Sequence, residues 1–175
     1  MSEAVGRAAA LVGLFVQPTT QWGSVDQVPA ADVPQPFRSL LDHDSHMTVA
    51  MERHHGGPVA LRIVAERAGP GDAYAREIVL TGPRGGVVQF GIVRLDMAAV
   101  AVETAARIRA GEVPLGRVLL DARALCTVGD VQLLRIEPGP HLERLIGPRP
   151  TFGRVATIAV AGRPAVELLE VVATG

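Results

Sequence analysis

Five stretches of the chain are rich in β-branched and apolar residues, and glycine or proline turns bound most of them, so they predict β-strands. They are residues 59–66, 74–82, 87–96, 152–162 and 163–173. The segment Pro83-Arg84-Gly85-Gly86 joins the second stretch to the third as a hairpin turn, and the last two stretches meet at Gly162-Arg163. Consecutive strands that short turns connect pair in the antiparallel sense, which predicts an antiparallel sheet.

Helical patterns separate these groups of strands. Residues 38–57 carry an apolar stripe at helical spacing, and near Asp44-Ser45 the stripe is interrupted at a place where a second helix can begin. The members of the stripe are Leu40, Leu41, Met47 and Met51. Glycines and a proline end the pattern at residues 56–58.

Two further helices are expected in the middle of the chain. The alanine-rich segment 97–111 predicts a helix with Asp96 as its N-cap and Gly111 as its end, and another helix starts near Pro114. Residues 131–139 show no clear period. Because helices lie between groups of strands instead of following every strand, the expected fold class is α+β with a single antiparallel sheet, not a doubly wound fold.

The N-terminal part of the chain has a different character. Residues 8–16 form an apolar run that is too short to span a membrane, and its flanks do not match a signal peptide, so a strand or helix packed on the core is expected. Residues 17–37 contain four prolines and predict an extended, mostly irregular connection. The chain of 175 residues is expected to be one domain, with 1–37 as an N-terminal extension and 38–175 as the core.

Composition narrows the range of functions. The net charge is −1 and no basic block occurs, so the sequence gives no electrostatic support for binding nucleic acid. All 17 basic residues are arginines, which excludes chemistry that depends on lysine. Cys126 is the only cysteine, so an intramolecular disulfide and a cysteine-rich zinc site are excluded, and a cytoplasmic protein is expected. His43 and His46 lack a recognised metal-binding pattern, so no metal or other cofactor is expected.

One arginine stands in an apolar strand. Side chains alternate between the two faces of a strand, so Arg76 shares its face with Tyr74, Ile78 and Leu80, while Glu77 lies on the other face. If the apolar face packs on the core, the guanidinium points inward and keeps its charge, so it needs an anion. That anion is either a carboxylate of the protein or the carboxylate of a ligand.

Glu170 is likewise a charged residue in an apolar strand, the last one of the chain. It shares its face with Val166, Leu168 and Val172, which suggests an inward carboxylate. Two interpretations remain: Glu170 pairs with Arg76 in the core, or both residues face a substrate, where a desolvated carboxylate is suited to proton transfer.

Three other positions are weaker candidates for the same site. Arg94 lies near a strand end, where it either reaches solvent or contacts a ligand. Gly91 lies within a strand, where glycine marks a bulge or a close approach of backbone to a ligand. Gly116 lies in the first turn of the helix that starts near Pro114, where free backbone N–H groups favour an anion.

Five fragments of the sequence occur in an order that resembles the chorismate pyruvate-lyase family, small enzymes that make 4-hydroxybenzoate. The fragments are LLDHDSHMT (40–48), REIVL (76–80), FGIVRLD (90–96), VPLGRVLL (113–120) and GRPAVELLE (162–170). The resemblance spans about residues 38–171. It departs from the family pattern at the inserted His46, at Ile92 in place of an arginine, and at Leu169 in place of a threonine.

The resemblance implies an antiparallel sheet with helices on one side and helical flaps over an enclosed ligand site. It implies that Arg76 holds a substrate carboxylate, that Glu170 faces the ring hydroxyl, and that Met47, Gly91 and Leu115 line the site. The implied activity is a lyase that removes pyruvate from chorismate or a close relative without a cofactor, in a monomer or small homo-oligomer that does not bind membranes.

The same fold also serves as the ligand-binding half of some bacterial transcription regulators. The resemblance therefore implies an alternative, a module that binds an aromatic or sugar carboxylate without converting it. A third possibility is a natural-product enzyme that uses the same pocket for another carboxylate.

Overall fold

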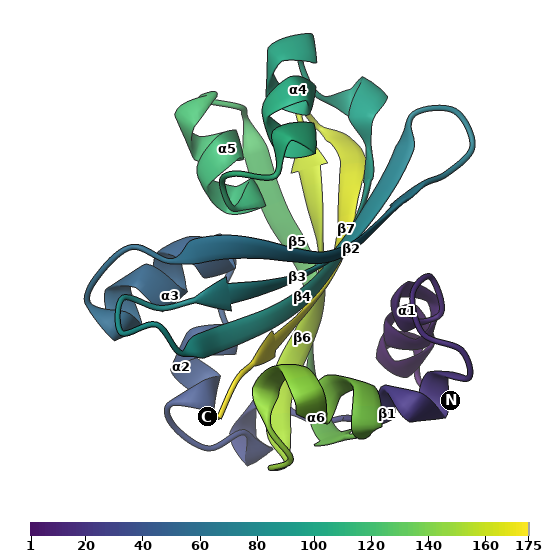
Figure 1. Ribbon diagram of the computed structural model, residues 1–175, viewed down its shortest axis with the longest axis vertical. Coiled ribbons are helices and arrows are strands. Elements are labelled where there is room, and N and C mark those ends of the chain that lie inside the picture. Colours follow the sequence, from purple (N-terminus) through teal and green to yellow (C-terminus); the bar gives the residue numbers. More distant parts are fainter. Residues whose placement is uncertain (175) are drawn as a thin grey trace.

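A single antiparallel sheet of seven strands organises the chain in a computed structural model that describes residues 1–174. The strand order is β1-β5-β6-β7-β4-β3-β2, and Figure 1 shows that the sheet is strongly twisted. The strands are β1 (Gly23–Gln27), β2 (Ala60–Ala68), β3 (Ala73–Thr81), β4 (Val87–Asp96), β5 (Cys126–Pro138), β6 (Thr151–Val160) and β7 (Arg163–Val172). The expected α+β class with one antiparallel sheet is confirmed.

The longest strand is one of two that the sequence pattern does not assign. β5 runs for 13 residues between β1 and β6. Its register with β6 shifts between Gly129 and Gln132, and Asp130 has a positive φ of 50°. This irregularity moves successive side chains off strict alternation, which explains why the apolar pattern of β5 is hard to recognise.

The segment expected to be irregular, 17–37, contains a short strand. β1 pairs with the end of β5, and two single turns of 3-10 helix flank it at Thr19–Gln21 and Ala30–Asp32. Gly23 makes this pairing possible, because its φ is +148° and a Cβ there would lie 2.4 Å from the carbonyl oxygen of Glu137. The N-terminal segment therefore adds the edge strand β1 to the sheet.

Two helices cover one face of the sheet (Figure 1). They are α1 (Glu3–Val12) and α6 (Pro140–Ile146), which pack on a core that includes Phe90, Ile92 and Leu169. The prediction that the apolar run near the N-terminus packs on the core is confirmed by α1, which buries Ala8 and Leu11. α6 has only seven residues, too few to show a helical period in the sequence. Whether 1–37 is best described as an extension of a single domain stays a prediction.

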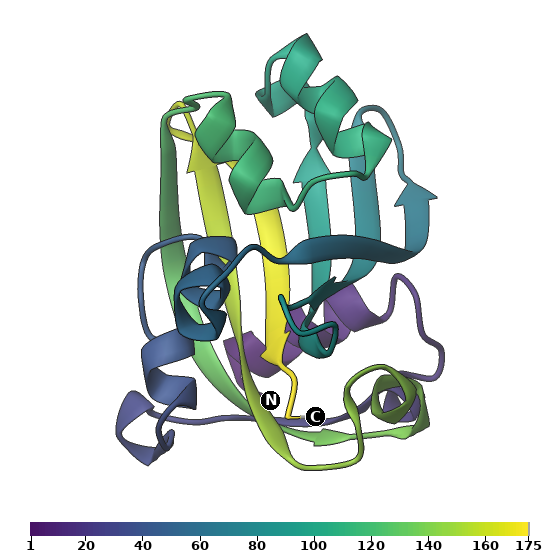
Figure 2. The same cartoon turned by 60° about the vertical axis from the view of Figure 1, so that its left-hand side comes forward.

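Four helices cover the opposite face: α2 (Phe37–Leu41), α3 (Met47–His55), α4 (Val102–Ala110) and α5 (Leu115–Asp121). Figure 2 shows α3 and α5 on the same side of the sheet. The expected interruption of the first helical stripe is present, with α3 starting at Met47. Asp96 caps the 3-10 turn Met97–Ala99 through the N–H of Ala98, so it is not the N-cap of α4.

Strand alternation divides the polar side chains between the two faces. Arg76 and Ile78 of β3 point to the side of α3 and α5, together with Glu170 of β7. Glu77 points to the other side, where its Oε1 lies 2.6 Å from Nε2 of His141 on α6. Among residues 1–174, no helix is long and apolar enough to cross a membrane.

Candidate functional site

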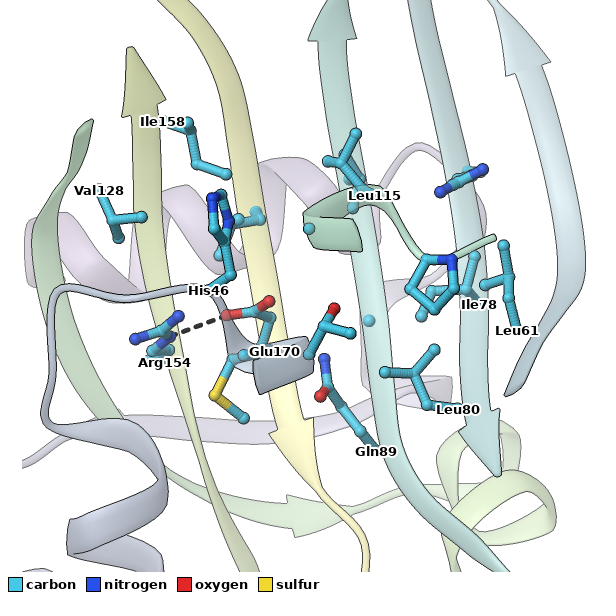
Figure 3. Close-up of a pocket in the computed structure, with 18 residues that line it drawn as sticks. His46, Leu61, Ile78, Leu80, Gln89, Leu115, Val128, Arg154, Ile158 and Glu170 are labelled. Carbon is cyan, nitrogen blue, oxygen red and sulfur yellow. Dashed lines mark hydrogen bonds and ion pairs between the residues drawn. The ribbon is translucent and has the colours of Figure 1, made fainter. Parts of the chain in front are cut away.

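A pocket lies between the sheet and the first turns of α3 and α5. The space inside it that the centre of a water-sized sphere can occupy is about 40 Å³. Figure 3 shows His46 and Glu170 on one side of it and Ile78 and Leu80 on the other, with Gln89 between the two groups. Its walls are mainly apolar, and a few polar groups converge on it: His46, Thr48, Arg76, Gln89, Arg154 and Glu170. A concave apolar site with few convergent polar groups is typical of small-molecule binding.

The structure brings most of the predicted site residues together. The six that line the pocket are Met47, Arg76, Gly91, Leu115, Gly116 and Glu170. Arg94 does not line it. Its side chain is 43% exposed on the opposite side of β4 from Gly91 and Val93 and forms an ion pair with Glu167, the residue directly across on β7. Because the end of β4 is open to solvent, Arg94 reaches water there and has a protein carboxylate as its partner.

Arg76 and Glu170 do not pair with each other. Glu170 lies opposite Gly91 of β4, while Arg76 lies opposite Val93 of the same strand. The two Cα atoms are thus two strands and two residues apart, which amounts to roughly 12 Å at ordinary strand spacings. The interpretation in which Arg76 is neutralised by Glu170 in the core is therefore wrong.

The guanidinium of Arg76 is buried with one direct hydrogen bond. The residue is 1% exposed, and its Nη1 donates to the carbonyl oxygen of Ile108 at 3.0 Å. Its Nε has no hydrogen-bond partner among the residues that the structure describes. Ile108 lies in the last turn of α4, where the helix dipole favours a positive charge and offsets part of its burial.

The carboxylate whose charge acts on Arg76 belongs to Glu66 of β2. Glu66 lies directly across from Arg76 in the strand register, and its Oε1 accepts a hydrogen bond from the hydroxyl of Tyr74 at 2.8 Å. Burial lowers the pKa of the Arg76 guanidinium, and Tyr74 and Glu66 oppose this change. The same network acts on Tyr74, where burial and the bond to Glu66 raise the pKa of the phenol to about 12. Glu66 thus acts on Arg76 from a distance, without forming an ion pair within 4.0 Å.

Glu170 pairs with a residue that the sequence analysis did not select. Arg154 of β6 lies directly opposite Glu170, and its Nε donates to Glu170 Oε2 at 2.8 Å (Figure 3). Arg154 is 1% exposed, as Arg76 is. The alternation rule used for Arg76 would have found it, because Arg154 shares its face with Ala156 and Ile158, two buried apolar residues.

Arg154 also holds the segment that connects α2 to α3. Its Nη1 donates to the carbonyl oxygens of His43 at 2.8 Å and of Leu41 at 3.3 Å, and its Nη2 donates to that of Ser45 at 3.1 Å. Residues 42–46 are therefore fixed to the sheet through one buried side chain. The segment carries His46 to the wall of the pocket.

The two histidines of this segment favour the neutral form. Nε2 of His43 lies 2.7 Å from the carbonyl oxygen of Leu40, so this nitrogen carries the proton and Nδ1 accepts from Ser45 Oγ at 2.9 Å. Burial lowers the pKa of His43, and the nearby Arg154 adds to this effect. Burial also lowers the pKa of His46, against the opposing influence of Glu170. Within residues 1–174, no group of three or more histidine, cysteine or acidic side chains could hold a metal ion.

Two glycines allow close packing around the pocket. A Cβ on Gly116 would lie 2.9 Å from Thr48 Oγ1 and 3.0 Å from His46 Cβ, so the first turns of α5 and α3 meet only because residue 116 has no side chain. A Cβ on Gly91 would lie 3.3 Å from Ile78 Cδ1, on the floor of the pocket beside Glu170. Glycine at 91 therefore leaves open the space between Ile78 and Glu170.

Comparison with known proteins identifies the fold. No protein-family model matches the chain, and no curated protein matches it significantly. Among solved structures, it is similar to the ligand-binding domain of a candidate GntR-family transcriptional regulator from Bordetella bronchiseptica. That match has a TM-score of 0.52 and 15% identity, and it covers 66% of this chain and 86% of that one.

Two other solved structures have the same arrangement. The effector domain of PhnF from Mycobacterium smegmatis matches with a TM-score of 0.51 and 16% identity over 74% of this chain and 89% of that one. The C-terminal domain of the histidine utilization repressor from Pseudomonas syringae matches with a TM-score of 0.51 and 11% identity over 66% of this chain and 92% of that one. At these identities the likeness concerns the fold alone, and it agrees with the expected single antiparallel sheet. The helices lie on both faces of that sheet, not on one side as expected.

Proposed function

We propose that this chain binds a small organic anion, with Arg76 holding its carboxylate in the pocket. The observation that carries the proposal is the incomplete pairing of this guanidinium. It is 1% exposed, lines the pocket and has an Nε without a partner within residues 1–174. A buried charge is stable only when it is paired and hydrogen-bonded, and a ligand carboxylate supplies both conditions.

Two features of the surroundings support a binding role. The pocket is lined by apolar side chains suited to a ring or short aliphatic body, such as Ile78, Leu80 and Leu168. The fold is that of domains described as ligand-binding or effector domains of transcriptional regulators, which agrees with recognition better than with turnover. A binding module without catalysis is therefore our first choice.

Isothermal titration calorimetry with chorismate, 4-hydroxybenzoate and benzoate tests the proposal. We expect at least one of them to bind, and we expect Arg76→Gln to weaken it by about tenfold to a hundredfold, since a hydrogen bond to a charged group contributes roughly 1.5–3 kcal/mol. Arg94→Gln is the matched control, because Arg94 is a solvent-exposed arginine outside the pocket and its loss should leave binding unchanged. Equal affinity of Arg76→Gln and the native protein would contradict the assignment.

A second candidate is the lyase that the sequence resemblance implies. It is favoured by the presence of Arg76 and Glu170 in one pocket without direct contact. Incubation with chorismate, followed by detection of pyruvate and 4-hydroxybenzoate, tests it. Binding of chorismate without release of either product would exclude the lyase and leave the binding module.

A further inference from the structure

Gln89 places an unused amide in the wall of the same pocket. It belongs to β4, is 3% exposed and lies directly across from Leu80 of β3 and Val172 of β7. Its Oε1 is buried without a hydrogen-bond partner among the described residues. Figure 3 shows the side chain between the group around Glu170 and the group around Leu80.

A buried amide oxygen without a partner is unfavourable unless something else satisfies it. Its neighbours in the strand register are apolar, and leucine or methionine would fill the same volume without leaving a polar atom unpaired. Gln89 and Arg76 are thus both buried polar side chains that line the pocket with an unpaired atom. We infer that Gln89 recognises an uncharged hydrogen-bonding group, such as a hydroxyl or carboxamide, on the part of the ligand farthest from its carboxylate.

The chemistry of the amide decides the kind of group. Glutamine offers a donor and an acceptor and carries no charge, so it pairs with a hydroxyl or a second amide, which also give and accept hydrogen bonds. A second carboxylate at this position would approach Glu170, which lies on the adjacent strand only two residues further along. The inference rests on the proposed function, since it concerns the same ligand.

The register gives the spacing of the two recognition points. Arg76 lies opposite Val93, and Gln89 is four residues away from Val93 along β4, so the Cα atoms of Arg76 and Gln89 are roughly 14 Å apart. Between them lie Ile78 and Gly91, and the missing side chain of Gly91 leaves room above the sheet. The two recognition points therefore correspond to a ligand with a carboxylate at one end and a neutral polar group at the other.

Matched ligands test the inference by calorimetry on the 175-residue chain. The probes are benzoates and phenylacetates that carry either a hydroxyl or a methyl group at the meta or para position, because these two groups have similar volumes. For the native protein we expect the hydroxyl compound to bind at least tenfold more tightly than its methyl partner in one of these pairs. For Gln89→Met we expect that preference to disappear or reverse, with the methyl compound bound at least as tightly as before.

The variant is chosen so that it folds. Methionine has nearly the volume of glutamine and no unpaired polar atom, so the melting temperature should be unchanged or higher. Three results would each overturn the inference. The native protein could show no preference for the hydroxyl compound, Gln89→Met could show the same preference as the native protein, or Gln89→Met could lose affinity equally for both partners of a pair. Failure of the proposed function looks different, because then no probe binds in a manner that depends on Arg76.

Discussion

Replacing Arg154 by methionine should be among the most damaging single changes near the pocket. The side chain is 1% exposed and donates to Glu170 Oε2 and to the carbonyl oxygens of Leu41, His43 and Ser45. Methionine fills much of the volume but leaves these acceptors unpaired and Glu170 without its counter-charge. Removing one partner of a buried ion pair costs about 3–5 kcal/mol, which is a large part of the stability of a typical domain.

Urea unfolding followed by circular dichroism measures this loss directly. In thermal unfolding, the same loss of about 3–5 kcal/mol corresponds to a fall in melting temperature of roughly 6–20 °C for a chain of this size. Arg94→Met is the matched control, because the ion pair of Arg94 with Glu167 is about half exposed and such pairs contribute less than about 1 kcal/mol. If Arg154→Met destabilised the protein no more than Arg94→Met, the reasoning from burial and hydrogen bonding would be refuted.

A double-mutant cycle separates the ion pair from the contacts with the connecting segment. Glu170→Gln removes the charge that Arg154→Met leaves unpaired, so the double variant should be more stable than the sum of the single effects predicts, by about 0.5–3 kcal/mol. The remaining loss belongs to the three backbone carbonyls. Hydrogen exchange should then show faster exchange of residues 42–46 in both variants that lack Arg154.

Two further predictions concern the helices over the pocket and the pH range of stability. Gly116→Val should cost about 1–3 kcal/mol by overpacking and weaken ligand binding, measured by urea unfolding and calorimetry, because its Cβ would lie 2.9 Å from Thr48 Oγ1. Because the pKa values of His43 and His46 are lowered in the folded chain, these histidines take up protons at a higher pH in the unfolded chain than in the folded one. The free energy of unfolding should therefore fall as the pH drops below about 6.5 towards the lower pKa values of the folded chain. His46→Gln should reduce that dependence in urea titrations, and an unchanged pH profile would contradict the role of His46.

The side chains that point inward could be predicted from the sequence because alternation is a local property of a strand. Arg76 and Glu170 were both placed on the buried face by their apolar neighbours, and both line the pocket. The same rule fails for β5, where the shift at Gly129 breaks the alternation. Alternation applies to strands and gives no information on α6. This helix has seven residues, too few to show a helical period of apolar residues.

Which charges pair with each other could not be predicted, because pairing depends on strand order and register. Alternation points both Arg76 and Arg154 inward from recognisable strands, so it offers Glu170 two possible partners. In the folded chain β6 is the neighbour of β7, which brings Arg154 directly opposite Glu170, and β4 separates Glu170 from Arg76.

This register gives the two buried arginines different roles. Arg154 donates to a carboxylate and three carbonyl oxygens, so its charge is balanced within the protein and its function is to hold residues 42–46. In the part of the chain that the structure describes, Arg76 donates to a single carbonyl oxygen, and its Nε has no partner. Burial alone does not distinguish them, since both are 1% exposed. The distinction lies in the number of acceptors around each guanidinium, and this difference is the basis for proposing Arg76, not Arg154, as the residue that binds an anion from outside the chain.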